Sequence, residues 1–239
     1  MSASALDFDG VIFNSIDECF RTSFAALRKV APYADFRSPM RDEWRELFYL
    51  NRGVVRPARD YFKLWKWILD SREDHDANLL ALSHISSTNK ELSEFETAFF
   101  AERASKINSN PSNFVKENPI YDGIAEVWSQ IPRPLYIVTT KDDFSTKFLL
   151  EHHGLEIDGL FTKEDGSKPD ALRKIARTCN LTIEKVRFVD DNPEHIQDGQ
   201  AAGATSRLVG WGYGPYLDSA LEIIRSPEEL IIFLSHEEK

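Results

Sequence analysis

Apolar positions divide the chain into two regions with different periodicity. Between Ser15 and about Lys116 they recur every three or four residues, which is the spacing of an amphipathic helix, and no strand pattern competes. Glu18 follows Ser15 at the spacing of a capping box, and Pro57 suits the first turn of a later helix. The helical series are Ile16, Phe20, Phe24, Leu27 and Ala31; Met40, Trp44, Leu47 and Phe48; Tyr61, Leu64, Trp65 and Ile68; and Leu92, Phe95 and Phe99. This region predicts a set of packed helices.

In the rest of the chain, short continuous apolar runs alternate with helical segments. The predicted strands are the residues before Asp7, Leu135–Val138, Gly159–Phe161, Val186–Val189 and Arg207–Val209. The predicted helices lie near 124–131, at 143–153, after Pro169, before Gly203 and from Ser226. The polar stretch 108–113 is predicted to be a loop. Buried strands joined by helical crossovers form a parallel, doubly wound sheet. The sequence therefore predicts an α/β protein with a Rossmann-like core at residues 1–14 and 117–239, and a helical insertion at residues 15–116.

Composition and charge exclude several classes of function. The 239 residues are 42% hydrophobic and 28% charged, which is ordinary for a globular protein. The formal net charge of -10 disfavours nucleic acid as a partner, and no apolar run approaches the about 18 residues of a membrane span. Cys19 and Cys179 lie on apolar helix stripes and are expected to pack rather than to form a disulfide. With no cationic start typical of a signal peptide, we expect a cytoplasmic protein.

Polar residues follow three of the predicted strands. They are Asp7-Phe8-Asp9-Gly10, Thr139-Thr140-Lys141 and Asp190-Asp191-Asn192. Ligands of doubly wound sheets bind beyond the carboxyl ends of the strands, so these groups are expected to meet there. Three or four carboxylates at one edge repel each other unless a cation lies among them. Oxygen ligands without a Cys/His cluster favour Mg²⁺.

A second part of the predicted site binds anions. Lys168 stands just before a helix that begins at Pro169, and a cation at a helix N-terminus attracts phosphate. A metal held by carboxylates, with the Thr139 hydroxyl and a lysine nearby, is suited to phosphoryl transfer, in which positioning and charge neutralisation dominate catalysis.

These motifs resemble those of the haloacid dehalogenase-like superfamily, in its phosphatase branch with a helical cap. Four family motifs occur in order: Asp7-Phe8-Asp9-Gly10-Val11, Thr139 after an apolar strand, Lys168-Pro169, and Asp190-Asp191 followed by Ala201-Ala202-Gly203. The stretch Gly210-Trp211-Gly212-Tyr213-Gly214 resembles the corresponding segment of phosphoglycolate phosphatase-like members. The resemblance implies that the insertion at 15–116 is the α-helical cap.

The resemblance also implies roles for the acidic residues. Asp7 would attack phosphorus and form an aspartyl-phosphate, and Asp9 would protonate the leaving oxygen and later deprotonate water. Mg²⁺ would be ligated by the side chains of Asp7 and Asp191 and by the backbone carbonyl of Asp9. Asp190 would contact the residues around the ion rather than the ion itself.

Three further residues are implied to bind the phosphoryl group. Thr139 would hold one of its oxygens, with Thr140 beside it, and Lys168 would neutralise both the phosphoryl group and the Asp7 carboxylate. Asn14, Thr140 and His195 depart from residues that are common in the family. For His195, a hydrogen bond to the neighbouring loop is favoured over a place beside the metal.

The reaction that we expect is hydrolysis of a small phosphomonoester, with phosphoglycolate suggested only by the resemblance. A phosphomutase that acts on a sugar phosphate uses the same residues, and a non-catalytic protein that binds a phosphorylated metabolite is a further alternative. A dehalogenase is disfavoured because displacement of halide needs neither Asp9 nor the metal cluster. The sequence does not indicate the oligomeric state. Arg52, Arg56 and Arg59 lie together in the insertion, where a solvated loop or ion pairs are favoured over contacts to a substrate carboxylate or second phosphate.

Overall fold

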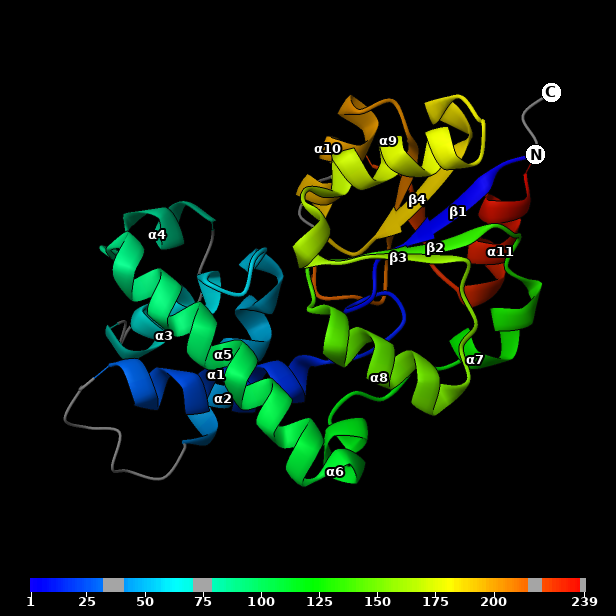
Figure 1. The fold of residues 1–239 in the computed structure, drawn as a ribbon. Coiled ribbons are helices and arrows are strands. Elements are labelled where there is room, and N and C mark those ends of the chain that lie inside the picture. The colour runs from blue at the N-terminus through cyan, green and yellow to red at the C-terminus, as the bar shows by residue number, and fades with distance from the viewer. Residues whose placement is uncertain (32–40, 71–78, 215–220, 237–239) are drawn as a thin grey trace. The chain divides into compact units, whose positions relative to one another are not determined.

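The computed structural model describes residues 1–31, 41–70, 79–214 and 221–236 (Figure 1). The chain divides into two compact units. The first unit joins residues 1–14 to residues 119–239, and the second consists of residues 15–118. Within the described residues, no helix is long and apolar enough to cross a membrane.

A six-stranded parallel sheet forms the centre of the first unit, and its strand order is β3-β2-β1-β4-β5-β6. The strands are β1 (Ala3–Leu6), β2 (Leu135–Val138), β3 (Gly159–Phe161), β4 (Val186–Asp190), β5 (Thr205–Val209) and β6 (Ile223–Ile224). The predicted doubly wound α/β fold is therefore confirmed. The short edge strand β6 was not predicted from the sequence, because two apolar residues carry no readable periodicity.

Helices cover both faces of this sheet. They are α7 (Ile124–Val127), α8 (Asp143–His153), α9 (Lys168–Thr178), α10 (Pro193–Ala201) and α11 (Pro227–Ser235), with 3-10 turns at Trp128–Gln130, Lys163–Asp165 and Ile183–Lys185. Helices α9 and α10 lie on one face, and α7, α8 and α11 lie on the other (Figure 1). The first face buries Leu172, Ile175 and Ile196 against the strands. The helix predicted near 124–131 is only one turn of α-helix followed by a 3-10 turn.

Side-chain caps decide where the helices behind the strand ends begin. The Asp142, Ser167 and Asn192 side chains accept hydrogen bonds from the first-turn amides of α8, α9 and α10, respectively. At the other end of α8, Gly154 adopts a left-handed conformation with φ of 63°. These caps fix the first turns of the helices that follow β2, β3 and β4 in the chain.

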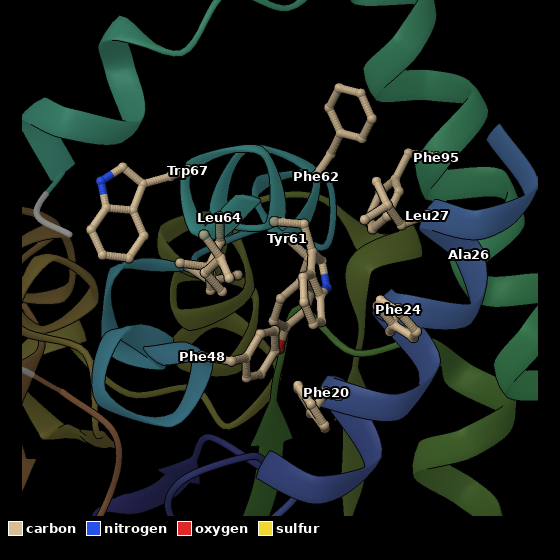
Figure 2. Close-up of a cluster of buried hydrophobic side chains, with 14 of the residues drawn as sticks. Phe20, Phe24, Ala26, Leu27, Phe48, Tyr61, Phe62, Leu64, Trp67 and Phe95 are labelled. Carbon is tan, nitrogen blue, oxygen red and sulfur yellow. The ribbon is translucent and has the colours of Figure 1, made fainter. Parts of the chain in front are cut away.

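The second unit is helical throughout its described residues. Its helices are α1 (Ile16–Val30), α2 (Asp42–Asn51), α3 (Asp60–Asp70), α4 (Leu79–His84), α5 (Asn89–Ser109) and α6 (Pro111–Lys116), with a 3-10 turn at Arg52–Val54. Figure 2 shows the aromatic side chains that α1, α2 and α3 direct into one cluster. Trp65 lies at its centre, with ring centroids 5.4, 5.0 and 5.5 Å from those of Phe20, Phe24 and Phe48. Its indole N–H donates to Ser23 Oγ, which satisfies the only polar atom of the side chain.

The predicted capping box at the start of α1 is wrong. Ser15 occupies the N-cap position, but its side chain accepts no capping hydrogen bond. Glu18 is fully buried and accepts hydrogen bonds from Arg103 Nε (2.9 Å), Arg103 Nη2 (2.7 Å) and the Thr22 hydroxyl (2.7 Å). A buried guanidinium 85 residues away therefore outcompetes the local cap.

Two other predictions for this unit differ from the structure. The stretch 108–113 is not a loop, because α5 continues to Ser109 and the Asn110 side chain caps α6, which begins at Pro111. Helix α3 begins at Asp60 rather than at Pro57. Met40 lies outside the described residues.

The cysteines and two of the three clustered arginines contact other residues of the protein. Cys19 and Cys179 are both free thiols, as expected. Arg59 forms an ion pair with Glu96 at 3.6 Å. The Arg52 guanidinium lies over the ring of Tyr61, 5.1 Å from its centroid, and donates to the Val55 carbonyl.

Candidate active site

The register of the sheet brings the predicted site residues to one edge. Leu6 of β1 lies beside Ile137 of β2 and Val189 of β4, so the next residues of all three strands emerge side by side. Asp7, Thr139 and Asp190 are these residues or their immediate successors, and each is at least nine-tenths buried. Thr140, the next residue after Thr139, is partly buried. The whole group belongs to the first unit.

Lys168 joins the first and last of these strand ends. Its ammonium lies 2.9 Å from Asp7 Oδ1 and 2.6 Å from Asp190 Oδ2. The contact with Asp190 is a hydrogen bond, whereas the contact with Asp7 is an ion pair, and the buried Asp7 Oδ1 accepts no hydrogen bond. The Ser167 cap fixes the turn of α9 from which the lysine projects. The Lys168 ammonium thus contacts two buried carboxylates.

Burial and charge act in opposite directions on these groups. Burial raises the pKa of Asp7 to about 6, although the Lys168 charge opposes it. Burial alone would also raise the pKa of Asp190, but Lys168 and His195 outweigh it and hold this pKa well below its ordinary value. Burial would lower the pKa of Lys168, and the Asp190 and Asp7 carboxylates reverse that effect and raise it. Asp190 and Lys168 therefore form a charged pair beside a carboxyl group that is harder to ionise.

The buried Asp190 carboxylate also contacts the Asn192 backbone and the His195 ring. Its Oδ1 accepts the backbone N–H of Asn192 at 2.8 Å, and His195 Nδ1 lies 3.3 Å from Oδ1 and 3.2 Å from Oδ2. His195 on α10 thus contacts the residue that ends β4. Asp7, Asp190 and His195 present ligand atoms within 4.8 Å of one another. The Lys168 ammonium bridges the two carboxylates of this group.

The Asp191 carboxylate lies against the loop that follows β1. A Cβ atom added to Gly10 would stand 2.3 Å from Asp191 Oδ2, so the absence of a side chain at Gly10 makes room for this carboxylate. The backbone N–H of Tyr213 donates to the same oxygen at 2.7 Å. Asp191 is therefore held at the Asp9-Gly10 segment.

The glycine-rich stretch 210–214 packs against the loop that follows β1. The Trp211 indole donates to the Val11 carbonyl at 3.1 Å, and the Tyr213 hydroxyl donates to the Phe13 carbonyl at 3.2 Å. A Cβ atom at Gly212 would stand 2.2 Å from Asp191 Cβ. These glycines allow the segment to pack directly on the site and to tie it to the loop after β1. The alternation of glycine with aromatic residues was the available signal in the sequence.

Asp9 forms an ion pair with Lys141, which belongs to the polar group that follows β2. The Lys141 ammonium lies 3.1 Å from Asp9 Oδ1 and 3.2 Å from Oδ2. The backbone N–H of Lys141 donates to Thr139 Oγ1 at 3.1 Å. In the sequence, the position of Lys141 two residues after Thr139 was the only sign that this lysine lies at the site.

The donor set fits a hard divalent cation. Asp7, Asp190 and Asp191 are three buried carboxylates, and Lys168 is the ammonium that contacts two of them; Asp9 has its own lysine. The raised pKa of Asp7 and its oxygen without a hydrogen bond indicate that more positive charge can be accommodated beside it. Oxygen donors are the ligands that Mg²⁺ prefers.

Comparison with known protein families agrees with this geometry. A family model described as haloacid dehalogenase-like hydrolase matches residues 1–203, which is most of the chain. The chain belongs to this family. The matched region contains both the helical insertion and every predicted site residue. The predicted resemblance is therefore confirmed, and the chain is a haloacid dehalogenase-like hydrolase.

Solved structures share the haloacid dehalogenase-like fold over nearly the full length of the chain. A predicted phosphoglycolate phosphatase from Haemophilus somnus is 15% identical, with a TM-score of 0.66 and coverage of 97% of both chains. A predicted phosphatase from Clostridium acetobutylicum is 20% identical, with a TM-score of 0.65 and the same coverage. Among curated proteins, tyrosine-protein kinase PtkA of Mycobacterium tuberculosis is 28% identical over 106 residues, which is 41% of this chain. The chain spans about a third of that relative, 36% of its length.

Replacing Gly10 with alanine is expected to destabilise the first unit more than the same change at Gly154. Both glycines have positive φ, 87° and 63°, so each alanine incurs about 1–2 kcal/mol of backbone strain. An alanine Cβ at Gly10 also collides with the Asp191 carboxylate, whereas nothing lies within 4 Å of the Cβ position at Gly154. Urea unfolding of both variants measures the difference. Equal losses would show that the Asp191 carboxylate moves aside freely.

Proposed function

We propose that this haloacid dehalogenase-like hydrolase is a Mg²⁺-dependent phosphatase that hydrolyses a small phosphomonoester through an aspartyl-phosphate on Asp7. The observation that carries the proposal is the placement of Asp7. It is a buried carboxylate at the end of the central strand, it contacts Lys168, and Asp9 lies two residues away with its carboxylate partly exposed. This arrangement supplies a nucleophile, a group that neutralises charge and a proton donor.

In the first step, a carboxylate oxygen of Asp7 attacks phosphorus and the bond from phosphorus to the ester oxygen breaks. Asp9 gives its proton to the departing oxygen, which leaves as an alcohol. Lys168 neutralises the negative charge shared by the phosphoryl group and Asp7, and the Thr139 hydroxyl, with Thr140 beside it, holds a phosphoryl oxygen. Lys168 and the Thr139 hydroxyl thus stabilise the charge on the phosphoryl group.

In the second step, water attacks the phosphorus of the aspartyl-phosphate. Asp9, now ionised, takes a proton from this water, and the acyl phosphate bond breaks to release inorganic phosphate and restore the Asp7 carboxylate. Dividing a difficult hydrolysis into two displacements lowers each barrier.

The proposed Mg²⁺ ligands are the carboxylates of Asp7 and Asp191 and the backbone carbonyl of Asp9. When bound, the ion would neutralise phosphoryl charge and orient the nucleophile. Asp190 supports the site without ligating the ion, because its oxygens already accept hydrogen bonds from Lys168 and the Asn192 N–H.

The proposed substrate is a small phosphorylated metabolite. Two structural neighbours are a predicted phosphoglycolate phosphatase and a predicted phosphatase, which supports a phosphate ester. A phosphomutase would use the same residues but would return the phosphoryl group to a second hydroxyl, and a binding protein would retain the ester intact. The kinase activity of the curated relative is not carried over, because the match covers about a third of that protein.

Phosphate release measures this function directly. We expect the purified full chain to release inorganic phosphate from 4-nitrophenyl phosphate and from members of a panel of small phosphate esters. Release should fall strongly with EDTA and return when excess Mg²⁺ is added. Metal-independent release would contradict the proposed role of Mg²⁺. Well-folded protein that releases no phosphate from any ester would contradict the phosphatase, and phosphoryl transfer between a bisphosphate and a monophosphate would then identify a mutase.

A further inference from the structure

Lys141 is the second buried lysine of the site. It follows β2 and its side chain is fully buried, whereas the Asp9 side chain that it contacts is 14% exposed. The ammonium is nearly equidistant from the two carboxylate oxygens, at 3.1 and 3.2 Å, and it lies 5.8 Å from the centroid of the Phe8 ring. The lysine therefore contacts Asp9 from the protein interior and leaves part of the carboxylate open to solvent.

The backbone of Lys141 is held in place on both sides. Its N–H donates to Thr139 Oγ1 at 3.1 Å, and its carbonyl accepts the Lys163 N–H at 3.2 Å. A hydroxyl oxygen that accepts an N–H directs its own proton elsewhere, so this bond leaves the Thr139 O–H available as a donor. Lys141 thus contacts two proposed catalytic-site groups, one through its side chain and one through its main chain.

We propose that Lys141 is a positioning residue that fixes the Asp9 side chain, whose carboxylic acid form gives a proton to the leaving group and whose carboxylate then takes one from water, and that it orients the Thr139 hydroxyl towards the phosphoryl oxygen. This inference rests on the proposed function, because it takes Asp9 as the general acid and base. Lys141 does not reach the substrate itself, since its side chain has no exposed surface.

The two buried lysines divide the carboxylates between them. Lys168 contacts Asp7, the proposed nucleophile, and Asp190, which supports the site. Lys141 contacts Asp9, the proposed general acid and base. A two-point contact between ammonium and carboxylate limits rotation of the Asp9 side chain. A general acid must lie within hydrogen-bond reach of the leaving oxygen, and a displacement of about 1 Å is enough to cost about 100-fold in rate.

The choice of leaving group distinguishes positioning of Asp9 from a general structural role. An alkyl phosphate needs a proton on its departing oxygen, whereas 4-nitrophenolate leaves readily without one. The second step is the same for every ester, so the comparison uses kcat/KM, which covers only the steps up to formation of the aspartyl-phosphate. For Lys141→Met we expect kcat/KM on an alkyl phosphate to fall about 100-fold and kcat/KM on 4-nitrophenyl phosphate to fall less than about fivefold. Lys141→Arg, which keeps the positive charge, should recover part of the loss on the alkyl ester.

The matched control is Lys174→Met, which removes a charge from an exposed position on α9, where the ammonium contacts the Asp165 carbonyl. It should leave both rates unchanged. Lys141→Gln removes the charge but keeps a hydrogen-bond donor, and it serves if the methionine variant does not fold. It should show the same dependence on leaving group.

Equal losses on the two esters, or no loss on either, would overturn the positioning role of Lys141 while wild-type turnover still supports the phosphatase. Wild-type protein that turns over neither ester would instead overturn the proposed function, and the role of Lys141 would fall with it. Assays of the wild type and the Lys141 variants on both esters therefore distinguish an incorrect role for Lys141 from an incorrect proposed function.

Discussion

Replacing Asp7 with asparagine is expected to reduce Mg²⁺-dependent phosphate release at least about 10⁴-fold, as is common when a nucleophile is removed. An amide is a poor nucleophile and a poor ligand for Mg²⁺, so the change affects both proposed roles of the residue. It is nevertheless close to isosteric and preserves the packing at the end of β1. The measurement is release of inorganic phosphate from the best ester of the panel.

Folding of this variant should be intact. The pKa of Asp7 is raised from 3.8 to about 6 by burial, so its ionisation disfavours the folded state. In metal-free buffer, wild-type stability should therefore fall relative to Asp7→Asn as pH rises from about 4 through about 6, and the difference should level off above that range. Thermal unfolding across this pH range provides the measurement.

Asp122→Asn is a matched control, because the same change of group is made at an exposed turn position. It should retain full activity. If folded Asp7→Asn protein kept more than a small fraction of wild-type release, Asp7 would not be the nucleophile and the covalent route would be wrong.

The second large effect is expected at the buried ion pair of the helical unit. Glu18 on α1 and Arg103 on α5 are 0% and 3% exposed, and the carboxylate accepts two hydrogen bonds from the guanidinium. Removing one partner leaves the other as an uncompensated buried charge. Arg103→Met should therefore lower the free energy of unfolding by about 3–5 kcal/mol.

A double variant tests whether the effect comes from the orphaned charge. Glu18→Leu combined with Arg103→Met replaces both charges with apolar groups, so it should lose less stability than either single change. Hydrogen exchange in α1 and α5 follows the opening of this unit by itself. Glu94→Gln, at the exposed Lys90–Glu94 pair, is the control and should have no measurable effect.

Losses of equal size at the buried and exposed pairs would contradict this account. Strictly additive losses in the double variant would also contradict it, because the two side chains would then act independently. The Arg103 guanidinium also lies 4.5 Å from the centroid of the Phe99 ring. Methionine can partly replace this packing contact, so the stability lost in Arg103→Met reports mainly the loss of the charge.

Five of the six strands, all except β6, and the order of the site motifs were predictable from local sequence. Leu135–Val138 is a continuous apolar run after two prolines, and the residues after it are polar; such a run is readable because a strand buried on both faces needs no alternation. Asp7 and Asp190 follow similar mainly apolar segments, each with one polar residue, and parallel strands place their carboxyl ends at one edge. The fold class and the candidate chemistry therefore followed from periodicity and position.

Partner choice was decided only by the tertiary structure. Glu18 has the spacing of a capping residue, yet Arg103 binds it from 85 positions away, and Lys141 contacts Asp9 across 132 positions. Both the local and the distant partner satisfy a carboxylate, and only the packed helices and strands decide which one is within reach. The Tyr213 N–H reaches Asp191 in the same way, through a turn whose glycines permit an approach that no side chain would allow. The sequence by itself determined which groups stand at the strand ends, and the tertiary structure decided which charges meet, because charge pairing depends on distances of a few ångströms that no spacing along the chain specifies.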